Sequence, residues 1–181
     1  MKYLIITVAG TATRFNRDTK EETLKCLYYT DEPQYALLAQ LLKNCGEYDK
    51  YILVGGYLYE KLGRFVKNEL SGYGKKIELV YNGHFKDYGS GYSLYKGIEA
   101  IKEAGDETFV EGDLFFMATD FRQVYNSPKS VITINREPIY SNKAVALYIN
   151  VDGKPRYLYD TNHQTLTVSE PFKAIFNSGQ M

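Results

Sequence analysis

The stretch with the strongest chemical signal is a run of small residues that ends in a basic one, Val8-Ala9-Gly10-Thr11-Ala12-Thr13-Arg14, with Lys25 further along the chain. Small residues let a ligand approach backbone N–H groups closely, and the basic residues beyond them indicate an anion. Arg14 can bind two phosphate oxygens at once and Lys25 can act as a point charge, so both could bind phosphates. The alternative is that both are surface charges paired with acidic residues of the same loop.

A second stretch, Glu111-Gly112-Asp113, ends an apolar run and offers carboxylates. A carboxylate beside a residue without a side chain, at the carboxyl end of a strand, can hold a Mg²⁺ ion that bridges substrate phosphates. Asp113 is the first candidate for this role, and Glu111 is a weaker one. The alternative for Asp113 is a turn or helix-capping residue.

A third stretch, Tyr88-Gly89-Ser90-Gly91, precedes an expected helix. Its glycines could admit the edge of a nucleobase against the backbone, with Ser90 forming a hydrogen bond. The alternative is a tight loop closed by the glycines, with Ser90 or Ser93 as the helix N-cap. The sequence contains neither G-x-x-x-x-G-K-[ST] nor G-x-G-x-x-G, so neither common phosphate-loop signature applies.

Alternating strands and helices must position these stretches. The hydrophobic pattern predicts strands at 2–8, 51–54, 77–80 and 108–110, helices near 33–44, 58–70 and 94–101, and a short extended piece at 24–29. From about residue 129 the pattern predicts strands only, at 130–135, 143–150, 154–159, 164–168 and 172–176, with a turn at Asp152-Gly153.

This order predicts an α/β fold with a mostly parallel, mixed sheet, helices on both faces, and a β-rich second half. We expect one domain over residues 1–181. Ligands of such sheets bind at the carboxyl ends of parallel strands. The loops 9–22, 82–91 and 111–120 all leave such ends, so we expect them to converge on one site.

Composition narrows the classes of function. The 22 basic and 22 acidic residues give a formal net charge of zero, which disfavours broad binding to nucleic acid or to an anionic membrane. The two cysteines, Cys26 and Cys45, are too few for a disulfide framework. Together with the two histidines they do not have the spacing of zinc ligands. We find no signal peptide and no run long enough to span a bilayer, so a cytoplasmic protein is expected.

Together these stretches resemble the nucleotidyltransferases that activate sugar phosphates and phosphocholine. Four segments carry the resemblance: residues 9–15 with Lys25-Cys26-Leu27, residues 51–57, residues 81–94, and residues 110–116. They occur in the family's order across residues 1–120, and the arrangement looks most like the cytidylyltransferase branch. The resemblance implies the three-layer, Rossmann-like α/β/α fold of the nucleotide-diphospho-sugar transferases.

The resemblance also implies a mechanism and a set of site residues. A nucleoside triphosphate, CTP or UTP, would lie on the first loop, with Arg14 and Lys25 as catalytic residues that neutralise its phosphates and Asp113 as a ligand of Mg²⁺. A phosphorylated acceptor would attack the α-phosphorus and pyrophosphate would leave. The group transferred would be a nucleotidyl group, and CMP is the one we expect. The implied nucleotide-binding residues are Val8, Ala9, Gly10, Thr11, Ala12, Thr13, Asn82, Gly89 and Ser90.

The sequence departs from the family pattern at three points, and the third keeps a second hypothesis open. Ala12 stands where a second glycine is common, and Cys26 follows Lys25 where proline is common. Family members usually continue beyond Gly179-Gln180 and carry a second metal-binding carboxylate there. The alternative is therefore a truncated, catalytically weak nucleotide-binding domain that acts as a sensor or a subunit. The acceptor, the base and the oligomeric state, a homodimer included, stay open.

Overall fold

The computed structural model describes residues 1–17, 19, 21–135, 146–158 and 167–178. The chain divides into two compact units, Met1–Pro128 and Lys129–Met181, each with its own sheet. The expectation of a single domain stays a prediction.

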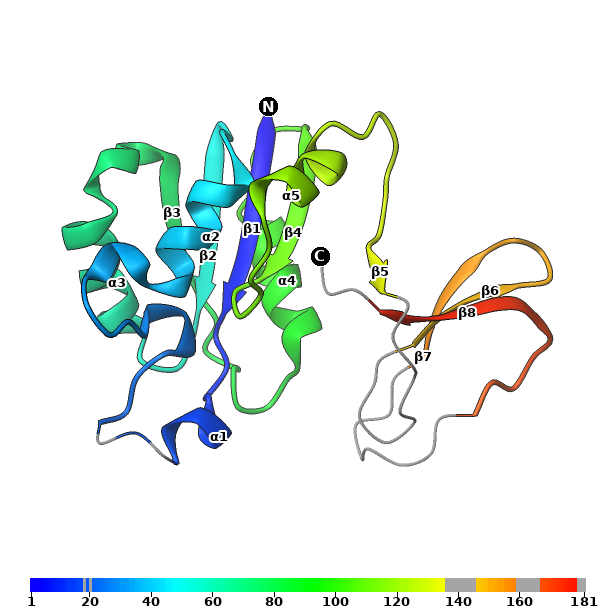
Figure 1. Ribbon diagram of the computed structural model, residues 1–181, viewed down its shortest axis with the longest axis horizontal. Helices are drawn as coiled ribbons and strands as arrows, with labels where there is room; N and C mark the ends of the chain where they lie inside the picture. Colours follow the sequence, from blue (N-terminus) through cyan, green and yellow to red (C-terminus); the bar gives the residue numbers. More distant parts are fainter. Residues whose placement is uncertain (18, 20, 136–145, 159–166, 179–181) are drawn as a thin grey trace. The chain divides into compact units, whose positions relative to one another are not determined.

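The first unit is built on a four-stranded sheet in which every pair of neighbours is parallel (Figure 1). The strand order is β3-β2-β1-β4, with bounds β1 Lys2–Val8, β2 Lys50–Gly55, β3 Ile77–Tyr81 and β4 Asp106–Glu111. The two central strands are almost wholly buried, as expected for a parallel sheet covered on both faces. The predicted strands and their parallel arrangement are confirmed.

Helices cover both faces of this sheet. They are α2 Leu37–Cys45, α3 Tyr59–Glu69, α4 Ser90–Glu99 and α5 Ala118–Tyr125, together with a short α1 Thr13–Asn16. Gly97 of α4 packs on Ile5, whereas Gly63 of α3 faces Leu79. Leu53 of β2 is in register with both Ile6 and Leu79, so the side chains of Ile6 and Leu79 point to the same face of the sheet. Ile5 precedes Ile6 in β1 and points to the other face, so α3 and α4 lie on opposite faces. The α/β/α layering is thereby confirmed.

The close packing of α4 on the sheet depends on Gly97. A Cβ at this position would lie 2.5 Å from Ile5 Cγ2 and 3.2 Å from Val54 Cγ2, both in the buried core. We expect Gly97→Ala to destabilise the fold by about 1–3 kcal/mol through overpacking, partly offset by the better helix propensity of alanine. Thermal or urea denaturation measures this. Gly91→Ala is the matched control in the same helix, because nothing lies within 4 Å of its Cβ position. Equal stability of both variants would contradict close packing at Gly97.

Three local expectations are wrong. The loop 9–22 contains α1, and the piece expected to be extended at 24–29 contains a 3-10 helix, η1 Lys25–Leu27. This turn buries Leu24, Cys26 and Leu27 together and leaves Lys25 exposed, which an extended strand with alternating faces could not do. Neither Ser90 nor Ser93 is an N-cap, because Gly89 is the N-cap residue of α4 and no side chain caps it.

Two further 3-10 helices complete the first unit, η2 Pro33–Tyr35 before α2 and η3 Ser71–Lys76 before β3. The second unit is an antiparallel sheet with the order β5-β8-β6-β7. Its strands are β5 Ile134–Asn135, β6 Ala146–Asn150, β7 Pro155–Leu158 and β8 Phe172–Ser178.

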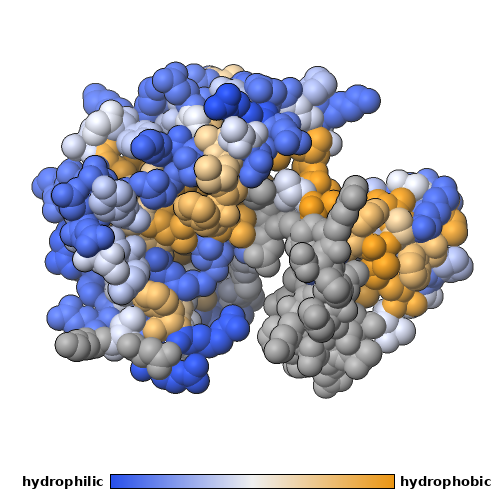
Figure 2. Space-filling view, viewed as in Figure 1, coloured by the Kyte–Doolittle hydropathy of each residue, from blue (hydrophilic) through white to orange (hydrophobic). Residues whose placement is uncertain are grey.

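The β-rich second half and its predicted turn are confirmed. Gly153 has φ +80°, and Asn150 Oδ1 accepts hydrogen bonds from the backbone of Asp152 and Lys154. The expected strand at 164–168 lies mostly outside the described residues, and residues 167 and 168 are not in a strand. Figure 2 shows apolar side chains on the surface of this unit. Its exposed large side chains include Val151, Tyr157 and Phe172. None of the described helices is long and apolar enough to cross a membrane.

Candidate active site

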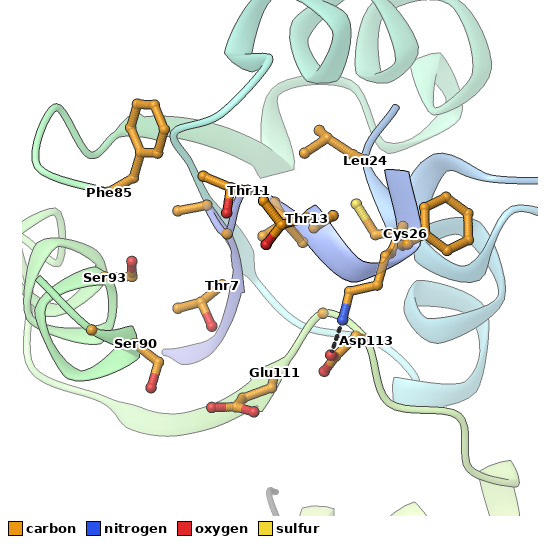
Figure 3. Close-up of a pocket in the computed structure, with 18 of the residues that line it drawn as sticks. Thr7, Thr11, Thr13, Leu24, Cys26, Phe85, Ser90, Ser93, Glu111 and Asp113 are labelled. Carbon is orange, nitrogen blue, oxygen red and sulfur yellow. Dashed lines mark hydrogen bonds and ion pairs between the residues drawn. The ribbon is translucent and has the colours of Figure 1, made fainter. Parts of the chain in front are cut away.

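A cavity of about 400 Å³ opens where β1 and β4 end and α4 begins (Figure 3). All the residues that line it belong to the first unit. They are Thr7, Val8, Ala9, Gly10, Thr11, Ala12, Thr13, Arg14, Phe15, Leu24, Lys25, Cys26, Phe85, Tyr88, Gly89, Ser90, Ser93, Glu111, Gly112 and Asp113. The three loops that were expected to converge therefore meet at one cavity.

The backbone of the loop after β1 forms one wall of this cavity. A Cβ at Gly10 would meet nothing within 4 Å, so open space borders the backbone there. Ala12 adopts φ +51° and ψ +34°, a left-handed conformation that is costly for a residue with a Cβ. This geometry gives a physical reason for the glycine that is common at this position in the family resembled. The strained turn leads directly into α1, which presents Arg14 on the exposed side.

Lys25 and Asp113 form an ion pair in the same cavity, with 2.5 Å between Nζ and Oδ2. Both side chains are 43% exposed, so solvent screens the pair and either partner can leave it at low cost. The structure thus brings together the predicted phosphate-binding lysine and the predicted metal ligand. Among the acidic residues of its loop that the structure describes, Glu21 and Glu22, neither forms an ion pair with Lys25, which pairs with Asp113 instead.

Gly112 explains why Asp113 reaches the cavity. Its backbone N–H donates to Thr7 O over 3.0 Å, and a Cβ at this position would lie 2.2 Å from Val8 Cγ1. Only a residue without a side chain lets the end of β4 lie so close to β1. Asp113 therefore leaves the sheet beside the loop after β1.

Glu111 is the second carboxylate in the cavity, and it lies opposite Thr7 in the parallel register of β1 and β4. Burial raises the pKa of Glu111 above its ordinary value, and the negative charge of Asp113 adds to the rise. A hydrogen bond with the Ser90 side chain and the charge of Lys25 oppose it. The ionised form of Glu111 is thus less stable in the folded protein than in the unfolded chain.

We expect Glu111→Gln to raise the melting temperature at pH 8 and to have little effect at pH 4. A raised pKa means that the folded state binds this proton more tightly, so ionisation costs stability above the folded pKa. The cost disappears as the pH falls and the carboxyl becomes protonated. Thermal denaturation across this pH range measures the difference. Glu107→Gln, an exposed position on the same strand, controls for the loss of one negative charge. A pH-independent difference between wild type and Glu111→Gln would contradict the raised pKa.

Cys26 lies in the cavity wall next to Lys25, but it is not suited to nucleophilic chemistry. Burial raises the pKa of its thiol to about 12, so the side chain is neutral at physiological pH. This agrees with a site whose chemistry comes from charges and backbone groups.

Every predicted site residue lines the cavity except Asn82. The Asn82 side chain is fully buried, donates to Ser93 Oγ over 2.9 Å and accepts from the backbone N–H of His84. Its own backbone N–H donates to Gly55 O. Asn82 therefore ties the loop before α4 to the end of β2, and its side chain contacts protein groups rather than the cavity.

Sequence reasoning overlooked the lining residues Thr7, Phe85 and Ser93 and gave Tyr88 no role within its stretch; Glu111, the weaker carboxylate candidate, also lines the cavity. Thr7 and Glu111 had a usable signal, because both are polar residues near the ends of otherwise apolar strands. Phe85 and Tyr88 gave none, because an aromatic residue in a loop does not indicate which way its ring points.

Mg²⁺ matches the donor groups at the charged end of the cavity. Mg²⁺ prefers hard oxygen ligands and is commonly bound by one or two carboxylates together with water and substrate phosphates. Asp113 and Glu111 supply carboxylate oxygens of this kind. Within the part of the chain that the structure describes, no group of three or more His, Cys, Asp or Glu side chains could hold a metal ion. A protein-only metal cage is thus absent there, whereas a site shared with substrate phosphates fits.

The parallel sheet with helices on both faces is a fold that this chain shares with solved structures of nucleotidyltransferases. Inositol-1-phosphate CTP transferase from T. maritima superposes with a TM-score of 0.67 at 17% identity, over 99% of this chain and 69% of that one. CTP:phosphocholine cytidylyltransferase from Streptococcus pneumoniae gives a TM-score of 0.52 at 21% identity, over 98% and 68%. HddC from Yersinia pseudotuberculosis, in complex with GMP-PN, gives a TM-score of 0.58 at 17% identity, over 98% of this chain and 74% of that one.

The chain belongs to the family of the domain of unknown function DUF6564, whose model matches residues 21–181. No curated protein sequence matches it significantly. The fold class predicted from the sequence is confirmed by the solved structures.

Proposed function

We propose that this chain is a Mg²⁺-dependent nucleotidyltransferase that transfers a nucleotidyl group, CMP in the first instance, to a phosphorylated small molecule and releases pyrophosphate. The observation that carries the proposal is the meeting of Lys25 and Asp113 at the charged end of a cavity walled by the backbone of residues 8–13. The fold shared with CTP-using transferases supports this choice. The acceptor would be a phosphocholine-like compound or a sugar phosphate.

The roles of the residues follow from their positions. The backbone N–H groups of residues 9–13 would face the triphosphate, and Arg14 and Lys25 would neutralise its charge. When the triphosphate binds, Lys25 would leave its ion pair with Asp113 and pair with a phosphate oxygen instead. Breaking the ion pair costs little free energy because it is exposed to solvent. Asp113, helped by Glu111, would hold Mg²⁺, which when bound neutralises phosphate charge.

The chain needs no covalent nucleophile for this reaction. A phosphate oxygen of the acceptor attacks the α-phosphorus in line, and the bond to pyrophosphate breaks as the new bond forms. The protein contributes the position of the two substrates and the stabilisation of charge on the leaving group. Its partners would be small molecules rather than nucleic acid or membranes, which fits a cytoplasmic location.

Release of pyrophosphate tests the proposal. The protein is mixed with Mg²⁺, each of CTP, UTP, ATP and GTP, and a panel containing phosphocholine and sugar phosphates. We expect acceptor-dependent release with CTP above the other triphosphates, and none when the metal is chelated. Failure of every combination would exclude the transferase function under these conditions.

One observation favours a second function, a nucleotide-binding domain without turnover. Within the described residues, the cavity contains two carboxylates, and one of them is already paired with Lys25. Thermal shift separates the two functions, because stabilisation by CTP without pyrophosphate release supports the binding domain. Absence of stabilisation by any nucleotide would contradict both functions.

A further inference from the structure

The cavity has an aromatic end as well as an end that carries the ion pair of Lys25 and Asp113. Figure 3 shows Phe85 and Ser93 at one end and Asp113 at the other. Phe85 and Tyr88 both line the cavity, and both come from the loop between β3 and α4. A nucleotide has the same division, since its phosphates are charged and its base is flat and uncharged. The charged end suits the phosphates, which leaves the aromatic end for the base.

The Phe85 ring is held in place by the backbone on which it packs. A Cβ at Gly56 would lie 2.5 Å from Phe85 Cβ and 2.7 Å from Phe85 Cγ, so the side chain lies directly on the bare Cα of Gly56. The Tyr57 ring lies 6.3 Å from the Phe85 ring, between centroids. The Tyr57 backbone N–H donates to Ala9 O, which joins this support to the loop after β1.

The start of the Phe85 loop is fixed as well. Asn82 anchors it through its hydrogen bonds with Ser93, His84 and Gly55. Two further backbone hydrogen bonds, from Asp87 and Tyr88 to His84 O, close the turn around Phe85. A ring held in this way loses little conformational entropy when a ligand packs against it.

We infer that Phe85 is the stacking platform for the nucleobase of the triphosphate. This inference rests on the proposed nucleotide-binding function and adds a residue to it. Any base has a π-face, so stacking on Phe85 contributes affinity without choosing among bases. The choice of base then falls to groups that can form hydrogen bonds with its edge, such as the Ser90 hydroxyl and the backbone at Ala9 and Gly10.

Calorimetric titration with two ligands tests this role. Phe85→Leu keeps an apolar side chain on Gly56 but removes the planar ring. We expect it to weaken CTP binding by about 5- to 150-fold, the range for loss of one base–aromatic stack. Binding of inorganic tripolyphosphate should stay unchanged, because that ligand has no base. Phe115→Leu is the matched control, since Phe115 is 71% exposed and does not line the cavity.

A fluorescent variant provides a readout that does not depend on activity or on an affinity difference. The sequence contains no tryptophan, so Phe85→Trp introduces a single indole at this position. CTP should quench its emission by stacking, and tripolyphosphate should not. Phe115→Trp should respond to neither ligand.

The outcomes are distinct from those of the transferase proposal. Quenching by CTP without pyrophosphate release would support the stacking role and contradict the transferase. Wild-type CTP affinity in Phe85→Leu, or no quenching in a Phe85→Trp variant that binds CTP, would overturn the stacking role even if the enzyme were active. Failure of the wild-type protein to bind any nucleotide would overturn both.

Discussion

Lys25→Ala should lower kcat/KM for pyrophosphate release by about 100- to 1,000-fold, the loss typical when one preorganised charge donor to a reacting group is removed. The Lys25 ammonium projects from η1 into the charged end of the cavity, where the phosphates of the triphosphate would lie. In the proposed reaction charge develops on the leaving pyrophosphate as the bond breaks, so the lysine would stabilise the transition state more than the bound substrate. Steady-state kinetics with CTP and the best acceptor measure the effect, which we expect mainly in kcat.

The stability of this variant should hardly change. Lys25 is 43% exposed and its ion pair with Asp113 is screened, so its removal should cost about 0–1 kcal/mol. Lys67→Ala, an exposed lysine on α3, is the matched control and should leave both activity and melting temperature near wild type. A large fall in the melting temperature of Lys25→Ala would show instead that Lys25 is a structural residue. Full activity would remove it from the catalytic mechanism.

The core of the fold could be predicted because hydrophobic pattern and topology agree. The buried runs of β1 and β2 have no polar face, which is typical of parallel strands covered on both sides. Their alternation with amphipathic helices then fixes the layers. The boundaries were less predictable, since η1 depends on how Leu24 and Leu27 pack and not on local propensity.

The charged half of the candidate site was predictable for a similar reason. The carboxyl ends of neighbouring parallel strands lie at one edge of the sheet, so residues after β1 and β4 had to come together. The ion pair between Lys25 and Asp113 could not be derived in this way, because it depends on the turn of η1 and on the close contact at Gly112. The aromatic end was also not predictable, because it depends on the packing of Phe85 on Gly56, residues that are far apart in sequence.

Asp113→Asn should lower kcat by about 100-fold or more and raise the Mg²⁺ concentration needed for half-maximal rate by about 10-fold, as expected when a metal ligand loses its charge. Asparagine keeps the size of the side chain and one oxygen, so the backbone at Gly112 need not move. The remaining carboxylate, Glu111, would still attract the ion, which is why some metal-dependent activity should persist at high Mg²⁺. Initial rates over a range of Mg²⁺ concentrations, at saturating CTP, separate the two effects.

A direct binding measurement distinguishes metal binding from a general electrostatic effect. Mn²⁺, titrated in the presence of CTP and followed by electron paramagnetic resonance, should bind Asp113→Asn about 10-fold more weakly than wild type. Asp31→Asn, an exposed aspartate outside the cavity, removes the same charge and should leave Mn²⁺ affinity unchanged. Because the substitution also frees Lys25 from its partner, CTP affinity without metal should stay equal or rise. If Mn²⁺ affinity were unchanged while the rate fell, Asp113 would act by positioning Lys25 and not by binding the metal.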